Sequence, residues 1–500
     1  MGNYKIKMNI GIYNEEDGLA DGVVAVSDGC IPESLETSID AVEKILLTVN
    51  KEVLKKSVSG YLETISKKKT ELEQNKNGGE IITNEKQYSV DGEIGRFSFN
   101  THTLVNEDKP IFNTSKDIFR TLRDREYYRT EGFNELLFPL VTNESYRHAE
   151  EKLNRIRREG EGGTPMRTLA GIVESESTKI NKNIDEKVET ILVNHKFSSD
   201  GHPIKPNAKY GESNEQMFID KTDVKKAQER YNNNVTNELK IEDVHCEKNY
   251  ADKTESTNIP VDDVGVKKQV EHRLINEQKE LKYVRNTIVH VENNDKQYYL
   301  NSGSTVSAMP VLLAFLLNNR LINTFIEFFV DGERSLQQTI IDHFSFHQSF
   351  NMILDWYHLK KKCELELSLA LKNKDFRNNA LSEITKYLWV GDVSGAIKII
   401  TNIDPVNIKS QANADRLVTY FERNLEYIPC YALRKELGLR NSSNRGEKAN
   451  DLVVAERQKH NGMSWSKDGS VGLATISALA LNDELHNWFS SGNVDFQLVS

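Results

Sequence analysis

Three acidic residues, far apart along the 500-residue chain, have the types and surroundings from which a metal site can be built. Asp262 lies in an otherwise apolar, strand-like segment, where a carboxylate is costly unless it is paired or bound to a metal. Asp331 follows a second apolar strand-like segment, and Gly332 after it allows the backbone to turn sharply. Glu447 begins a predicted helix after a turn of Ser, Asn and Gly residues. Such a set forms an all-oxygen site suited to Mg²⁺ or Mn²⁺.

The chemistry that this site would support is phosphodiester cleavage. Two divalent ions about 3.5–4 Å apart can activate an attacking hydroxyl and stabilise the leaving oxygen. In open α/β sheets, ligands bind in the crevice beyond the carboxyl ends of the strands, which is where Asp331 is expected. There is also a simpler interpretation. An Asp-Gly pair after a strand is often only a turn, and Glu447 in a first helical turn often only complements the helix dipole.

The elements around the acids predict an α/β fold, with a mixed sheet, for residues 258–360 and 441–490. Strand patterns occur at 258–266, 287–291, 297–300, 324–330 and 351–354, the second and third flanking a hairpin turn. A nearly all-apolar helix is expected over 308–321, a helix with Leu336, Ile340, Ile341 and Phe344 on one face follows the fourth strand, and a last helix is expected over 472–489. Residues 361–440 are predicted to form an all-helical insertion. This order fits a sheet with helices on its faces.

The N-terminal half is predicted to contain three further parts: an α+β region of unknown role over residues 1–125, a helical part over 126–182, and a polar, partly helical connector over 183–257. Within the helical part, a helix from Ser145 to Arg158 and a glycine-rich break precede a second helix, which Thr164 can cap with Pro165 at its first position. This outline is typical of a DNA-binding helix-turn-helix, in which Arg167 would contact DNA, but also of a plainly packed helical hairpin.

Composition limits the class of protein. Hydrophobic residues make up 38% of the chain and charged residues 28%, with a net charge of −10, which weakens any claim of indiscriminate polyanion binding. The four cysteines show no Cys-x-x-Cys spacing, which argues against a thiolate zinc site and a disulfide scaffold. The longest apolar run, 308–317, is shorter than the roughly 20 residues of a membrane span, and the start has no apolar stretch of export-signal length. We therefore expect a cytoplasmic protein that does not enter a membrane.

Four blocks of sequence closely resemble bacterial DDE-type insertion-sequence transposases. They read FVDGER at 329–334, ILDWYHLKKK at 353–362, NSSNRGEKAND at 441–451 and RQKHNGMSWS at 457–466. The chain is similar to the branch long filed as an uncharacterised protein family, whose catalytic domain is similar to that of Mutator-like elements. The resemblance is strong over about 259–489 and loose over 127–182. It implies an RNase H-like fold with a helical insertion before the helix that carries Glu447.

The resemblance also implies roles for single residues. It places the three metal-binding, catalytic acids at Asp262, Asp331 and Glu447. The family usually has Asp-Gly at the first position, and Asp263 replaces that Gly here, so either Asp262 or Asp263 could be the ligand. Asp355 and His358 are expected to support the site, His358 by orienting a phosphate or a carboxylate, unless it is a hydrogen-bonded histidine in a packed corner.

Basic residues near these blocks fit a DNA path, because phosphate contacts position a duplex without reading its sequence. They are Lys360, Lys361, Lys362, Arg445, Lys448, Arg457 and Lys459. A solvated charged face is an equally good interpretation of the three consecutive lysines. Trp465 either stacks on a base or anchors the packing of its turn.

The function expected from the resemblance is that of a transposase that cleaves and joins the ends of its own insertion sequence with Mg²⁺ or Mn²⁺. Its partners would be the element ends, target DNA and further copies of the chain, in the bacterial cytoplasm at the nucleoid. Two alternatives remain: a non-catalytic DNA-binding relic or repressor, and an RNase H-like nuclease that hydrolyses DNA without strand transfer.

Overall fold

A computed structural model describes residues 4–13, 20–31, 39–85, 87–107, 109–114, 128–159, 163–205, 210–211, 221–232, 250, 256–269, 283–459 and 463–498. The chain divides into two compact units. Unit 1 comprises residues 1–175 and 489–491, and unit 2 comprises residues 176–488 and 492–500. The division falls inside one long helix, α5 (Met166–Asn194).

Unit 1 is an α+β structure followed by helices, as the sequence predicts. Its elements are β1 (Tyr4–Tyr13), β2 (Ala20–Ile31), α1 (Ile39–Asn77), β3 (Glu80–Thr83), β4 (Tyr88–Gly92), β5 (Gly95–Phe99), β6 (His102–Asn106), β7 (Lys109–Asn113), α3 (Glu131–Asn143) and α4 (Tyr146–Ile156). The strands form antiparallel sheets β1-β2, β4-β5 and β3-β6-β7. The long helix α1 ends at Asn77, and Gly78 after it has a φ of +64°, which suits glycine.

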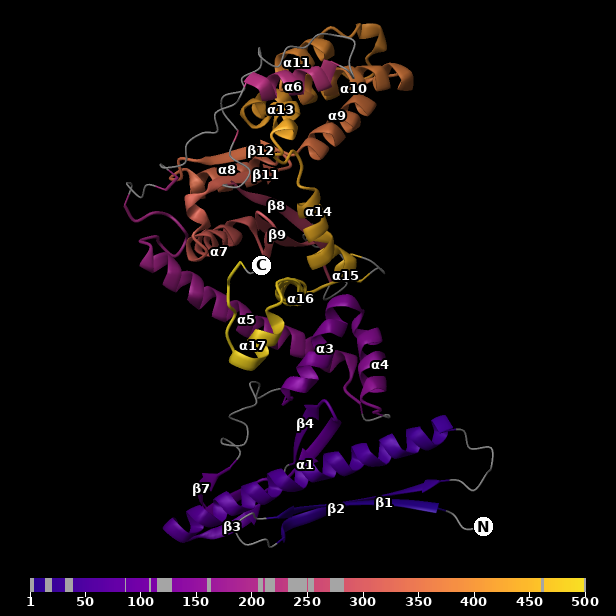
Figure 1. The fold of residues 1–500 in the computed structure, drawn as a ribbon, viewed down its shortest axis with the longest axis vertical. Coiled ribbons are helices and arrows are strands. Elements are labelled where there is room, and N and C mark those ends of the chain that lie inside the picture. Colours follow the sequence, from indigo (N-terminus) through magenta and orange to yellow (C-terminus); the bar gives the residue numbers. More distant parts are fainter. Residues whose placement is uncertain are drawn as a thin grey trace, which may run out of the picture. The chain divides into compact units, whose positions relative to one another are not determined.

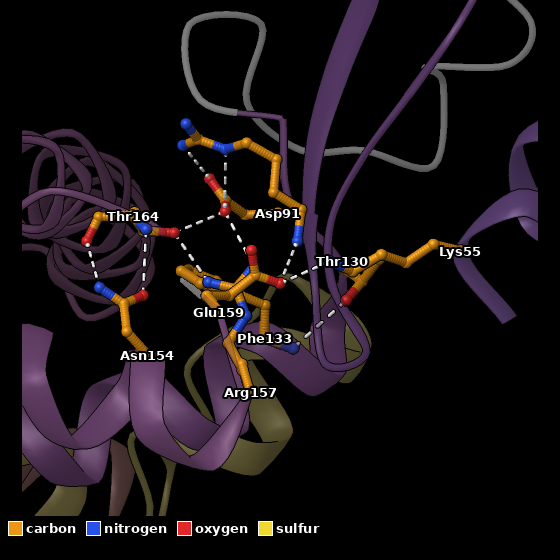
Figure 2. Close-up of polar contacts among 9 residues, drawn as sticks. Lys55, Asp91, Thr130, Phe133, Asn154, Arg157, Glu159 and Thr164 are labelled. Atoms are coloured by element: carbon orange, nitrogen blue, oxygen red, sulfur yellow. Dashed lines mark hydrogen bonds and ion pairs between the residues drawn. The ribbon is translucent and has the colours of Figure 1, made fainter. Parts of the chain in front are cut away.

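A buried ionic network fixes the segment between α4 and α5 (Figure 2). Asp91 of β4 accepts hydrogen bonds from the Arg157 guanidinium at 3.0 Å and the Thr164 hydroxyl at 2.6 Å. Glu159 pairs with Lys55 of α1 at 2.8 Å. Burial alone would raise the pKa of Asp91, but the hydrogen bonds from Arg96 and Thr164 and the charge of Arg157 outweigh it, so the pKa is lowered.

This network changes the interpretation of the predicted helix-turn-helix. Thr164 does not cap the second helix, because its hydroxyl contacts Asp91 and Arg157, and α5 begins at Met166. Residues 157–165 separate α4 from α5, whereas the turn of a helix-turn-helix has about three or four residues. Residues 160–162 of the predicted glycine turn lie outside the described residues. The described residues on either side, Arg157, Glu159 and Thr164, contact β4 and α1 of unit 1, and DNA contact by Arg167 stays a prediction.

Unit 2 contains a mixed five-stranded sheet at the places that the sequence predicts. Its strands are β8 (Ser256–Lys267), β9 (Tyr283–Asn293), β10 (Lys296–Ser302), β11 (Phe325–Val330) and β12 (Phe350–Leu354). Their order is β10-β9-β8-β11-β12. The pairs β10-β9 and β9-β8 are antiparallel, and the pairs β8-β11 and β11-β12 are parallel. Every residue of β11 is buried, as its apolar sequence requires.

Helices cover both faces of this sheet (Figure 1). α7 (Thr305–Asn318) contacts β9 and β10 and also α8 (Arg334–Phe344). α14 (Asn444–Asn450) contacts β8 and β9, and α16 (Lys467–Leu481) contacts β9 and β10. Between them, a single π-helical turn over Asp451–Ala455 leads into α15 (Glu456–Gln458). The mixed α/β fold class is thereby confirmed.

Helices also occupy the region predicted as a helical insertion, and they begin directly after β12. This region contains α9 (Trp356–Ala370), α10 (Lys374–Trp389), α11 (Val393–Thr401), α12 (Gln411–Arg423) and α13 (Tyr431–Glu436), drawn in orange in Figure 1. Its core is continuous with the sheet through Phe329, Ile353 and Leu354. α6 (Lys221–Asn232), from the predicted connector, packs on α13. Residues 233–249 and 251–255 of that connector lie outside the described residues.

The helix expected over 472–489 is two helices. α16 ends at Leu481, Asp483 takes a φ of +59°, and α17 runs over Leu485–Ser491. The break allows the Asn482 amide to bond both the N–H and the carbonyl of Tyr299 on edge strand β10. An unpaired strand edge is a template for unwanted association, and this side chain covers part of it. Among the described helices none is both long enough and apolar enough for a membrane span.

Candidate active site

Asp262 lies on the face of β8 that α14 covers. Its Oδ2 accepts a hydrogen bond from Asn450 Nδ2 at 2.6 Å, and its Oδ1 accepts one from the Asp263 amide at 2.8 Å. Burial raises the pKa of Asp262 to about 6, and the charge of Asp331 adds to this rise, while both hydrogen bonds and the charge of His358 oppose it. The positive charge and hydrogen bonds around Asp262 therefore do not fully offset the cost of burying its charged form.

Asp263 points to the opposite face of the same strand, because successive strand residues alternate. The Thr287 hydroxyl donates to its carboxylate, the Thr305 hydroxyl lies 3.4 Å away, and Arg285 lies 3.9 Å away. These partners belong to β9 and the start of α7. Of the two acids left open by the sequence, Asp262 is the one on the side of Asp331 and His358.

Asp331 follows the last residue of β11, at the carboxyl end of the strand. Its Oδ1 accepts a hydrogen bond from the Glu333 amide at 2.8 Å, which closes the turn that leads into α8. Gly332 in this turn has a φ of +88°, a conformation that favours glycine. The Asp-Gly pair is therefore a turn, as the simpler interpretation held, and this turn places a half-buried carboxylate near Asp262.

Glu447 stands in the first turn of α14 and contacts His358 of α9, with Glu447 Oε1 3.4 Å from His358 Nε2. α14 approaches β8 closely at Gly446. A Cβ atom there would lie 2.4 Å from the Cβ of Pro260, two residues before Asp262. Glycine is therefore required next to Glu447 for α14 to reach this position over the sheet.

Asp355 joins the elements that carry these groups. It is buried, with 1% exposure, and it caps α9 by accepting the His358 amide at 3.0 Å. Its other oxygen accepts the amide of Ser443, just before α14, and its own amide donates to Val330 at 2.9 Å. The carboxylate of Asp355 therefore joins the starts of α9 and α14, and its backbone amide joins them to the end of β11.

Asp262 and Glu447 thus lie near His358, and Asp331 lies near Asp262, although the three acids span almost two hundred residues of sequence. Asp331 and His358 both act electrostatically on Asp262, His358 contacts Glu447, and Asn450 links the Glu447 helix to Asp262. The ligand oxygens of the three acids do not all lie within 4.8 Å of one another. The set is therefore open rather than closed around one ion. Carboxylate oxygens are ligands that suit Mg²⁺ or Mn²⁺. A cation beside Asp262 would favour the charged form of this carboxyl, whose pKa is raised by burial.

The predicted DNA-contacting side chains differ in exposure. Exposed on the surface are Lys360, Lys361, Arg445, Lys448, Lys459 and, in unit 1, Arg167. Lys361 lies over the ring of Tyr357 at 5.6 Å, and Lys448 pairs with Glu456 at 3.1 Å. Lys362 is half-buried and pairs with Glu366 at 2.9 Å. Arg445 and Lys448 are therefore exposed and at the same time held in ion pairs, Arg445 with Glu292 and Lys448 with Glu456.

Arg457 and Trp465 face the protein interior. Arg457 is 3% exposed and its guanidinium lies 5.1 Å from the centre of the Trp465 ring. Trp465 is 6% exposed, and its indole N–H donates to the Gln458 carbonyl at 3.0 Å. Its ring cannot stack on a base in this arrangement, which is that of the packing anchor considered as the alternative. We leave both residues out of the DNA-contacting surface.

Two polar residues of the site were missed by sequence reasoning. Asn450 holds Asp262, and its spacing of three residues after Glu447 puts both on one side of α14, which was the available signal. Glu292 of β9 is buried and pairs with Arg440 and with Arg445, next to the same helix. No local pattern in the sequence connects Glu292 with residues about 150 positions later.

Comparison of the chain with protein-family models, with curated proteins and with solved structures finds no match.

Proposed function

We propose that the chain is a DDE-type transposase that cleaves DNA at the ends of its own insertion sequence and joins them to a target. The observation that carries the proposal is that Asp262 lies near both Asp331 and His358, and that His358 contacts Glu447. Each acid comes from a different segment, namely β8, the turn after β11, and α14. A cluster of carboxylates at the carboxyl end of a parallel strand pair is a site for ligands rather than for packing.

The sheet supports an RNase H-like fold for this unit. Numbered along the chain, its strands have the order 3-2-1-4-5, with the first three antiparallel and the last two parallel to the first. The first acid lies on the central strand and the second at the end of its parallel neighbour. The third comes from a helix after the helical insertion. This arrangement agrees with the resemblance of the four sequence blocks.

In this function the acids would hold Mg²⁺ or Mn²⁺, which supplies an activated hydroxyl and stabilises the leaving oxygen when bound. The chain itself contributes positioning. Asp355 holds α9 and α14 in register, Asn450 orients Asp262, and His358 stands beside Glu447, where it can donate to a carboxylate or a phosphate. Positioning accounts for most of the catalysis in such chemistry, because no protein nucleophile is needed.

DNA would approach across α9 and α14, from which exposed cations project. Lys360 and Lys361 follow His358 on α9, and Arg445 and Lys448 flank Glu447 on α14. The net charge of −10 makes this local clustering necessary for binding a polyanion. Contacts of this type hold the phosphate backbone in register and do not by themselves choose a sequence.

The test is a cleavage assay on a supercoiled plasmid that carries the two stretches of DNA flanking the coding region. With Mg²⁺, the wild-type protein should nick at the element ends and then join the freed 3′ ends to a second plasmid. Asp331→Ala and Glu447→Ala should abolish both steps and leave end binding in a gel shift intact. Asp342→Ala, an exposed-helix acid away from the site, is the matched control and should cleave normally.

Two other outcomes identify the alternatives. Binding of the ends without any metal-dependent nicking would indicate a DNA-binding relic or repressor. Nicking without joining would indicate a nuclease of the same fold. Retained cleavage by Asp331→Ala or Glu447→Ala would refute the assignment of the acids.

A further inference from the structure

We propose that Tyr420 and Arg423, on α12 of the helical insertion, are positioning residues that set the affinity of the acid site for its metal by holding the Asp331 turn. The proposal rests on the proposed function, since it names what controls the same site. Its basis is a set of contacts between α12 and two consecutive backbone carbonyls directly after β11.

The contacts are direct hydrogen bonds. The Tyr420 hydroxyl donates to the carbonyl of Asp331 at 3.1 Å, and Arg423 Nη2 donates to the carbonyl of Gly332 at 2.8 Å. The two donors lie one turn apart on α12, and the Arg423 guanidinium also lies 5.6 Å from the centre of the Tyr420 ring. Tyr420 and Arg423 therefore hold the backbone of Asp331 and Gly332 in place.

Gly332 shows that this approach is close. With a φ of +88°, its missing Cβ would lie 2.5 Å from the Tyr420 hydroxyl oxygen and 2.9 Å from a ring carbon. Any side chain at 332 would push the tyrosine away from Asp331. The glycine after the acid therefore has two purposes, which are to allow the turn and to admit the hydroxyl.

The same end of α12 also holds the helix that follows the turn. Asn424, fully buried, accepts a hydrogen bond from Gln337 of α8 at 2.7 Å and donates to the Tyr420 carbonyl at 2.8 Å. The turn is thus fixed on both sides, by Tyr420 and Arg423 at its backbone and by Asn424 through α8. Three residues at one end of α12 therefore contact Asp331, Gly332 and Gln337.

The consequence concerns metal binding. Two carboxylates at one site repel each other before a cation binds, so a freely moving turn would relax by moving Asp331 away from Asp262. α12 opposes this relaxation because Tyr420 is embedded in the insertion core with Leu417 and Phe421. The acids are therefore held close before the cation arrives. Groups that orient metal ligands in this way typically contribute about 10–100-fold to metal affinity or activity.

The experiment uses the full-length protein and two conservative variants, Tyr420→Phe and Arg423→Gln. The controls are Tyr427→Phe, a tyrosine that packs against the same core, and Arg416→Gln, an arginine on the same helix two turns earlier. The readouts are the Mg²⁺ concentration at half-maximal nicking of the flank-bearing plasmid, the dissociation constant for Mn²⁺ by calorimetry, and the melting temperature.

We expect each variant to raise the half-maximal Mg²⁺ concentration and the Mn²⁺ dissociation constant about tenfold, with the rate at saturating Mg²⁺ reduced less. The two controls should match the wild type. A purely structural role would lower the melting temperature and leave both metal constants unchanged, and that result would overturn the proposal. So would unchanged metal constants at an unchanged melting temperature.

Failure of the proposed function is a separate outcome. If the wild type binds Mn²⁺ at Asp262, Asp331 and Glu447 but cuts no DNA, the transposase assignment fails while the calorimetric comparison still tests Tyr420 and Arg423. If the wild type cleaves DNA and the variants have unaltered metal constants, the function stands and the positioning role is refuted.

Discussion

Asp262→Asn should stabilise the metal-free protein and at the same time destroy its cleavage activity. Asp262 is half-buried close to another carboxylate, and its pKa is raised to about 6 by burial first and by Asp331 second. A neutral amide of the same shape removes both penalties. A residue that costs stability in the absence of its ligand is the behaviour expected of a binding site rather than of a structural acid.

The size of the effect follows from the pKa. A rise from 3.8 to about 6 corresponds to about 3 kcal/mol between the two protonation states. Solvent screening at this half-buried position reduces that figure, and asparagine keeps only one acceptor oxygen, so one of the bonds from Asn450 and Asp263 is lost at a cost of about 1 kcal/mol. The net gain should be about 1–2 kcal/mol, or roughly 2–6 °C in melting temperature.

The gain depends on pH in a defined direction. Because the folded-state pKa of Asp262 lies above its unfolded value of 3.8, folding is favoured by proton uptake, and the penalty of the charged form is absent below about pH 4 and complete above about pH 6. The stabilisation of Asp262→Asn over the wild type should therefore be smallest at pH 4 and reach its plateau near pH 7.

The assay is thermal and urea unfolding in EDTA at pH 4, 6 and 8. The measurements are then repeated with Mg²⁺ in excess of the EDTA, raised in tenfold steps. Mg²⁺ should stabilise the wild type and not the variant, because binding to the folded form raises stability. Asp263→Asn is the matched control, since that side chain faces Thr287 and Arg285 on the other side of β8. A variant less stable than the wild type in EDTA at pH 8 would refute the reasoning.

Three more predictions concern the supports of the fold and the site. Asp91→Ala should destabilise unit 1 by about 3–5 kcal/mol, because it leaves the fully buried Arg157 without its carboxylate, and a urea titration followed by circular dichroism measures this. Gly446→Ala should slow cleavage with little change in DNA binding, because the added Cβ would force α14 away from Pro260. This holds although alanine favours a helix over glycine by about 1 kcal/mol. Single-turnover nicking rates measure the effect. Asp355→Ala should cost about 1–3 kcal/mol and reduce the nicking rate, and a melting curve beside the same nicking assay separates the two effects.

Local patterns were sufficient for much of unit 2. Alternating and continuous apolar runs predicted all five strands of its sheet, since strand periodicity depends on residues two apart. The same patterns put Asp262 inside a strand and Asp331 at a strand end. They could not decide between Asp262 and Asp263, because the choice depends on which face of β8 meets α14, and that is a property of tertiary packing.

Contacts between distant segments account for what the sequence did not reveal. Arg157 looks like a surface cation at the end of a helix, yet it is buried because Asp91, 66 positions earlier, lies against it. Arg457 is predicted from the sequence to lie on the DNA path and Trp465 either to stack on a base or to anchor packing, yet the two side chains pack on each other. The Tyr420 hydroxyl reaches Asp331 across 89 positions, a spacing that no periodicity encodes. In each case the burial of a polar group was decided by a partner from another element.

The central claim is that Asp262, Asp331 and Glu447 share a divalent cation site. The most direct measurement is anomalous diffraction from crystals of the full-length protein grown with Mn²⁺. We predict manganese peaks within coordination distance of carboxylate oxygens from all three residues, lost in crystals of Asp331→Ala. A well-ordered site region with no manganese near these three carboxylates, at a Mn²⁺ concentration that supports cleavage, would contradict the account.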